Sequence, residues 1–159
     1  MKEIIGDIWT FHKEGHWIVI TTNIGWKSDG TNPMGAGIAK VASELYPGLS
    51  GWYGLKCQKF RERTPTCYYQ LGKLFLFPTK AFNESQPWMS WKQDSSVELI
   101  TKSTKQLSAL VDILGDKVFG DIGIPLVGCM NGKLRRRDVI NILRDNLSDR
   151  FILIEKDHC

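Results

Sequence analysis

Short apolar runs along the chain alternate with longer stretches in which apolar positions recur every three or four residues. The short runs are rich in β-branched and aromatic residues, which predicts strands. They are "EIIGDIW" (3–9), "WIVITTN" (17–23), the two halves of "CYYQLGKLFLFPTK" (67–80) hinged near Gly72, "VFGDIGIPLVG" (118–128) and "RFILIEK" (150–156).

Three stretches have the period of an amphipathic helix. The first covers residues 36–45 and the third covers residues 135–147. The second is predicted to begin with Ser95 as its N-cap and Glu98 as the capping-box partner, and to end at Gly115. Its apolar or small face consists of Val97, Ile100, Thr104, Leu107, Val111 and Leu114. Strands that alternate with such helices predict an α/β fold, a three-layer α/β/α sandwich covered on both faces.

The composition is that of one globular domain, 1–159, because 42% of the 159 residues are apolar and 24% are charged. We expect a cytoplasmic protein without membrane contact, since the sequence has no signal-peptide profile and no apolar run approaching the roughly 20 residues that cross a bilayer. Four cysteines without C-x-x-C spacing and three histidines without paired spacing predict free thiols, no metal and no cofactor. The net charge of +4 suits a polyanionic ligand, a weak attraction to nucleic acid, or neither.

Polar and glycine-rich segments follow several predicted strands, at the edge of the sheet where ligands bind in α/β proteins. Asn23 precedes "TNPMGAGIAK" (31–40), and "GCMNG" (128–132) follows another strand. Glycines allow close approach to the backbone, and a helix that begins at such a loop directs free N–H groups toward an anion. Two such loops together would suit a diphosphate. The alternative is that each glycine only makes a tight turn, and neither the G-x-G-x-x-G fingerprint nor the P-loop pattern is present.

Five motifs occur in the order and at about the spacing found in macrodomains. They are "GDIW" (6–9), "TN" (22–23), "MGAGIAKVASELYP" (34–47), "FPTK" (77–80) and "IPLVGCMNGKL" (124–134). The sequence most closely resembles the branch that contains the terminal ADP-ribose protein glycohydrolase and the antitoxin that removes ADP-ribose from DNA. The resemblance implies a macrodomain-like fold with a mixed, largely parallel central sheet, acting as a monomer.

The resemblance also implies a site for ADP-ribose. Asp7 would accept a hydrogen bond from the adenine amino group, although a cap after the strand is the simpler interpretation, and the backbone N–H of Ile8 would contact the adenine ring. Asn23 would contact the distal ribose. Two loops would enclose the diphosphate and the distal ribose, one made of Met34, Gly35, Ala36, Gly37 and Ile38, the other of Gly128, Cys129, Met130, Asn131 and Gly132.

Lys80 is the expected catalytic residue. In the similar glycohydrolases the lysine of this motif reaches the anomeric carbon of the distal ribose, where it acts as a nucleophile or as an assisting charge. A nucleophilic lysine must be deprotonated, which requires a pKa lowered by burial or by neighbouring cations.

The chain departs from the family in two places. Residues 24–33 are an insertion that we expect to bulge over the distal ribose, with candidate selectivity residues Trp26, Lys27, Asp29 and Asn32. In the protein glycohydrolase an aspartate of the second loop assists catalysis, and Gly132 occupies that position here. The DNA-specific branch has a similar Asn-Gly pair.

The implied function is hydrolysis of an ADP-ribosyl linkage on nucleic acid or protein, with modified single-stranded DNA as a candidate partner. Two alternatives stay open: binding of ADP-ribose or a related signalling nucleotide without turnover, and a phosphatase acting on ADP-ribose 1″-phosphate. A nucleic-acid-binding module is a fourth possibility, since Trp88, Trp91 and the basic run 135–137 could hold a single strand. A packed tryptophan pair and a solvated helix end are the simpler interpretation of those residues.

Overall fold

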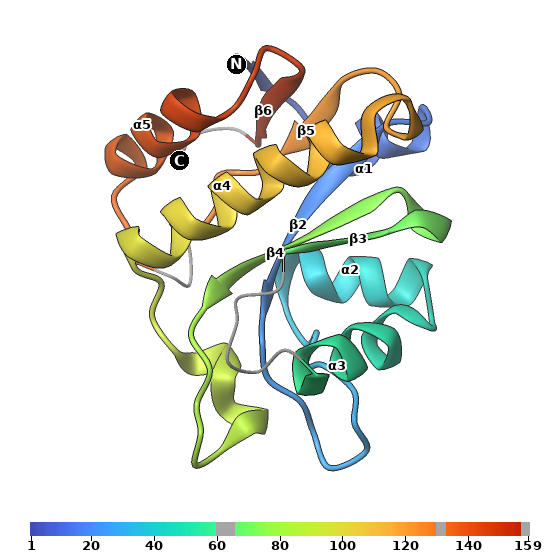
Figure 1. Ribbon diagram of the computed structural model, residues 1–159, viewed down its shortest axis with the longest axis vertical. Coiled ribbons are helices and arrows are strands. Elements are labelled where there is room, and N and C mark those ends of the chain that lie inside the picture. The colour runs from blue at the N-terminus through green and yellow to red at the C-terminus, as the bar shows by residue number, and fades with distance from the viewer. Residues whose placement is uncertain (60–65, 130–132, 157–159) are drawn as a thin grey trace.

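The computed structural model describes residues 1–59, 66–129 and 133–156, and its centre is one six-stranded sheet with the order β1-β6-β5-β2-β4-β3 (Figure 1). The strands are β1 (Lys2–Ile5), β2 (Trp17–Asn23), β3 (Cys67–Tyr69), β4 (Leu74–Lys80), β5 (Ile122–Ile124) and β6 (Phe151–Glu155). All neighbouring pairs are parallel except β3 and β4, which are antiparallel. The expectation of a mixed, largely parallel sheet is confirmed.

Helices lie on both faces of this sheet (Figure 1). They are α1 (Ile8–Lys13), α2 (Gly37–Leu45), α3 (Leu49–Lys59), α4 (Val97–Leu114) and α5 (Arg136–Asn146), with the short 3-10 helices η1 (Gln70–Gly72), η2 (Pro87–Lys92) and η3 (Gly115–Lys117). One core lies between the sheet and α4 with α5, and the other lies under α1, α2 and α3. The three-layer prediction is therefore confirmed.

The central strands serve both cores because successive side chains of a strand point to opposite faces. In β2, Trp17 and Val19 belong to the core under α4, whereas Ile18 and Ile20 belong to the other core. The side chains of β4 divide in the same way. Strands buried on both faces read as continuous apolar runs, which is why these two were clear in the sequence.

Three details differ from the sequence-based expectations. The run "EIIGDIW" is not one strand, because β1 ends at Ile5 and Asp7 becomes the N-cap of α1. The N-cap of α4 is Ser96 rather than Ser95, since Ser96 Oγ accepts a hydrogen bond from Leu99 N at 3.1 Å. Helix α3 was not predicted: Leu49, Tyr53 and Cys57 are buried at a helical spacing, but the exposed Leu55 and the glycines obscure this pattern in the sequence.

The insertion at residues 24–33 packs against α3. Asn32 N donates to Ser50 O at 2.9 Å, and Gln58 Nε2 donates to Gly30 O at 3.2 Å. The two backbones approach so closely at Gly54 that a Cβ there would stand 2.0 Å from Gly30 O. Gly54 is thus required by the close approach of the loop.

No helix in the described ranges is both long enough and apolar enough to cross a membrane.

Gly54→Ala should lower the free energy of unfolding by about 1–3 kcal/mol, the usual cost of overpacking, because backbone atoms of Gly30 and Asn32 cannot yield easily. Gly51→Ala is the matched control in the same helix, where a Cβ meets nothing within 4 Å. That control should be neutral or more stable by up to about 1 kcal/mol, as for Gly→Ala in a helix. Thermal and urea unfolding measure both, and equal effects of the two substitutions would contradict the packing argument.

Candidate functional site

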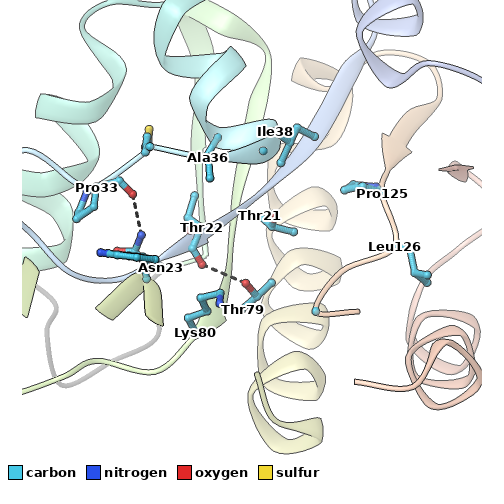
Figure 2. Close-up of a pocket in the computed structure, with 16 residues that line it drawn as sticks. Thr21, Thr22, Asn23, Pro33, Ala36, Ile38, Thr79, Lys80, Pro125 and Leu126 are labelled. Atoms are coloured by element: carbon cyan, nitrogen blue, oxygen red, sulfur yellow. Dashed lines mark hydrogen bonds between the residues drawn. The ribbon is translucent and has the colours of Figure 1, made fainter. Parts of the chain in front are cut away.

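A pocket of about 430 Å³ opens at the carboxyl ends of β2 and β4 (Figure 2). Its walls come from the ends of these strands, the segment 33–39 that leads into α2, Trp91 of η2, and the segment after β5. The lining residues are Thr21, Thr22, Asn23, Pro33, Met34, Gly35, Ala36, Gly37, Ile38, Ala39, Thr79, Lys80, Trp91, Pro125, Leu126 and Gly128. This is the edge of the sheet that the sequence indicated.

Many of the predicted site residues meet in this pocket. They are Asn23, Met34, Gly35, Ala36, Gly37, Ile38, Lys80 and Gly128. Asp7, Ile8 and Cys129 do not line it, and Met130, Asn131 and Gly132 lie outside the described residues. Other lining residues were not predicted as site residues. Thr21 precedes the "TN" motif, and Pro125 and Leu126 lie within "IPLVGCMNGKL" but before its glycine loop.

The N-terminus of α2 gives the pocket an anion-binding wall. Ala36 is the N-cap, with an extended backbone, and its side chain makes no cap hydrogen bond. The first N–H groups of a helix have no partner within the helix, and the helix dipole adds positive potential there. Gly37, the first helical residue, has φ of 58°, which favours glycine. A Cβ on Gly35 would meet nothing within 4 Å, so this backbone is open to a ligand.

A register shift places Asn23 beside Lys80. Thr22 pairs with Pro78 and Asn23 pairs with Lys80, so Thr79 is passed over in the ladder. Thr79 Oγ1 donates to Thr22 O at 3.4 Å across the irregularity (Figure 2). Bulges of this kind redirect side chains, and here the two polar strand ends face the same pocket.

The Lys80 amine has an unusual electrostatic environment. Its Nζ donates to Gln93 O at 3.0 Å, and the side chain is half-buried. Burial is the main cause that lowers the pKa of Lys80, and the charge of Lys133 lowers this pKa further, whereas Asp94 opposes the shift. Lys133 Nζ lies 3.5 Å from Asp94 Oδ1, so the two neighbours partly cancel each other. Lys80 therefore loses its proton at a lower pH than an ordinary surface lysine does.

Asp7 is the N-cap of helix α1, as the simpler interpretation of the sequence predicted. Its Oδ1 accepts from Trp9 N at 2.8 Å, and the carboxylate remains exposed. One acceptor oxygen is not used by this bond, so a further hydrogen bond to a ligand stays a prediction.

The loop 24–33 differs from its expected role. Trp26, Lys27, Asp29 and Asn32 do not line the pocket. Trp26 stacks on Phe82 with ring centroids 4.9 Å apart, and Asn32 is buried. Of residues 24–33, Pro33 alone lines the pocket, and the loop is held against α3 by the hydrogen bonds of Asn32 N and Gly30 O.

Trp88 and Trp91 in η2 do not form the packed tryptophan pair that was the simpler expectation from the sequence. Trp88 and Trp91 are 49% and 47% exposed, and Trp91 lines the pocket. Two of the arginines near the start of α5 are ion-paired at the surface, Arg135 with Asp138 at 3.0 Å and Arg136 with Glu155 at 2.6 Å.

Within the described ranges, no group of three or more His, Cys, Asp or Glu side chains could hold a metal ion. Cys57, Cys67 and Cys129 are free thiols, and burial raises the pKa of Cys67 to about 12.

Comparisons with known proteins place the fold. No protein-family model and no curated protein matches the sequence. Several solved structures do match: the macrodomain of Thermus aquaticus DarG has a TM-score of 0.73 and 21% identity over 98% of this chain and 97% of that chain. The macrodomain of Mycobacterium tuberculosis DarG has a TM-score of 0.70 and 19% identity, over 98% and 99%.

A third similar structure, Thermosipho africanus DarTG in complex with ADP-ribose, has a TM-score of 0.73 and 16% identity over 99% of this chain but 42% of that chain. At these identities the likeness defines the architecture: the chain has the macrodomain fold.

Lys80 should react with an amine-directed reagent at lower pH than a free lysine side chain, because a lowered pKa leaves more neutral amine. Lys133→Gln removes a repelling charge and should move the Lys80 midpoint to higher pH, whereas Asp94→Asn should move it lower. Mass spectrometry of peptides labelled over a pH series measures each midpoint. A Lys80 midpoint equal to that of a free lysine side chain would contradict the assigned environment.

Proposed function

We propose that this chain binds ADP-ribose in the pocket and hydrolyses ADP-ribosyl linkages, with Lys80 as the catalytic residue. One observation carries the proposal: a half-buried lysine with a lowered pKa stands beside Asn23 in a pocket whose opposite wall is an uncapped helix N-terminus. The pocket volume falls in the range of roughly 300–1,000 Å³ that ligand sites occupy. DarTG, which shares the fold, was solved in complex with ADP-ribose.

The pocket offers each part of ADP-ribose a suitable partner. The diphosphate would lie against Gly35, Gly37 and the free N–H groups of α2, where negative charge is stabilised. The distal ribose would then lie between Asn23 and Lys80, with Trp91 at the rim. Adenine would extend toward Asp7 and Ile8, beyond the lining of the pocket.

The reaction needs the neutral amine of Lys80. Its nitrogen forms a bond to the anomeric carbon, the bond from that carbon to the acceptor breaks, and the acceptor leaves with the electron pair and the proton of the amine. Water then attacks the same carbon, releases ADP-ribose and restores the neutral lysine. Each step conserves atoms and charge, and the acceptor can be a nucleic-acid or a protein group.

A binding function without turnover is the second candidate. Among the described residues that line the pocket there is no Asp, Glu or His, so these residues offer no carboxyl or imidazole as a general acid. In that case Lys80 would contact ribose or phosphate as a charge. Calorimetry that shows tight ADP-ribose binding, together with no release from modified DNA, modified protein or ADP-ribose 1″-phosphate, would select this function.

Lys80→Ala should reduce the release of ADP-ribose from modified substrates by at least about a hundredfold, the scale of losing a nucleophile, while ADP-ribose affinity changes by less than about tenfold. Lys105→Ala is the matched control, since it removes the same charge from the exposed face of α4. Chromatography of released ADP-ribose measures the rates on single-stranded DNA and on protein. Full activity of Lys80→Ala on both would refute the assignment of Lys80.

The pH dependence distinguishes the two roles of Lys80. A nucleophile must be neutral, so single-turnover rates should rise with pH and level off below the usual lysine range, because the pKa is lowered. A lysine that assists as a charge would instead give rates that fall over the same interval. Single-turnover rates over a pH series, with Lys133→Gln moving the inflection upward, decide between them.

Gly35→Val tests the binding wall without disturbing the fold. A side chain at this position enters open space, so thermal stability should stay within a few degrees of the parent, while the added bulk should weaken ADP-ribose binding by at least about tenfold. Calorimetry with ADP-ribose measures the affinity. An unchanged affinity would mean that the ligand does not lie against the Gly35 backbone.

A further inference from the structure

The insertion at 24–33 delivers one buried side chain, Asn32, to the back of the pocket wall. Asn32 is 1% exposed. Its Nδ2 donates to Asn23 O at 3.1 Å, to Asn23 Oδ1 at 3.1 Å and to Gly25 O at 2.8 Å. Its Oδ1 is buried and makes no hydrogen bond. Every hydrogen bond of this side chain is therefore directed at Asn23 and the residue two positions later.

These contacts leave one hydrogen of the Asn23 side-chain amide without a hydrogen-bond acceptor among the described residues. Asn23 Oδ1 accepts from Gly25 N at 2.9 Å and from Asn32 Nδ2, which occupies both lone pairs of the oxygen. Asn23 Nδ2 donates one hydrogen to Pro33 O at 2.8 Å (Figure 2). The second Nδ2 hydrogen is the capacity that remains, on a residue that lines the pocket.

We propose that Asn32 is a positioning residue that fixes the Asn23 amide in one orientation, so that Asn23 can only donate a hydrogen bond to the ligand. The reversed amide would bring Asn23 Nδ2 against two donors, Gly25 N and Asn32 Nδ2, and Oδ1 against the Pro33 carbonyl. The arrangement therefore excludes the acceptor orientation. Asn32 itself never touches the ligand and acts through Asn23.

The consequence is a preference for a ligand group with an acceptor oxygen beside Lys80. A ribose hydroxyl oxygen meets that requirement, and this assignment of the ligand rests on the proposed function. The insertion then contributes selectivity by orienting a residue of the pocket through Asn32, which does not itself line the pocket.

A double-mutant cycle tests the proposal with calorimetry of ADP-ribose and of ADP, which lacks the distal ribose. Asn32→Leu should weaken ADP-ribose binding about tenfold, the scale of one hydrogen bond, and leave ADP binding within about twofold. In an Asn23→Ala background the same substitution should cause no additional loss, because its effect passes through Asn23. Asn32→Ala, which removes the donor without adding bulk or charge, should give the same pattern if Asn32→Leu folds poorly.

Asp29→Ala is the control within the same loop. Asp29 Oδ1 accepts from Thr31 N and Thr31 Oγ1 and does not contact Asn23, so this substitution loosens the turn and should preserve the ratio of ADP-ribose to ADP affinity. Additive losses in the cycle, or an unchanged ratio in both Asn32 variants, would overturn the positioning role and leave Asn32 as a structural residue.

A measurement without ligand separates this proposal from the proposed function. Nitrogen-15 NMR of the free protein follows hydrogen exchange of the Asn23 side-chain amide, assigned by its loss in Asn23→Ala. Exchange should be at least about tenfold faster in Asn32→Ala than in the parent, because the orientation is released. Unchanged exchange would refute the positioning role even if ADP-ribose binds, whereas failure of the parent to bind ADP-ribose would refute the proposed function alone.

Discussion

The site depends on the register shift where β2 and β4 end. Because Thr79 is passed over in the ladder, Asn23 and Lys80 become direct neighbours. Pro78 can occupy this strand because it lies next to the irregularity, and its carbonyl accepts from Ser103 Oγ at 2.6 Å. Strands β2 and β4, which are buried on both faces, thus end in the polar residues Asn23 and Lys80. These two residues stay adjacent as long as the pairing of β2 with β4 is intact. The uncapped start of α2 faces that pair from the opposite wall.

The electrostatics of the pocket follow from this geometry. The N–H groups of α2 supply positive potential without a charged side chain, and positive potential favours the loss of a proton from a nearby lysine. On the opposite wall of the pocket, burial of the Lys80 amine disfavours its charged form and so lowers its pKa. In our proposal the pocket attracts a diphosphate while its lysine deprotonates at reduced pH. The two demands agree in sign, because positive potential and burial both lower the pKa of a lysine.

The sequence predicted most of the architecture because β2 and β4 are buried on both faces and α4 has a regular apolar stripe. It could not show α3, whose buried positions include Gly54, a residue that reads as a helix breaker until its contact with Gly30 is seen. The glycine-loop residues and Lys80 were predicted as site residues, whereas Thr21 and Pro125 were not, since only their place in space shows that they line the pocket. Asn32 was a candidate selectivity residue, but its proposed action through Asn23 could not be predicted, because it depends on hydrogen bonds across a loop.

The contact between Gly54 and Gly30 has a consequence for variation in this protein. Gly54 does not line the pocket, yet a side chain there would push against Gly30 O and Asn32 N, and Asn32 holds Asn23. In our proposal, a change on α3 would therefore reach Asn23 through only two residues. A side chain at position 54 and the backbone of Gly30 would compete for the same space, so helix α3 and the inserted loop constrain each other.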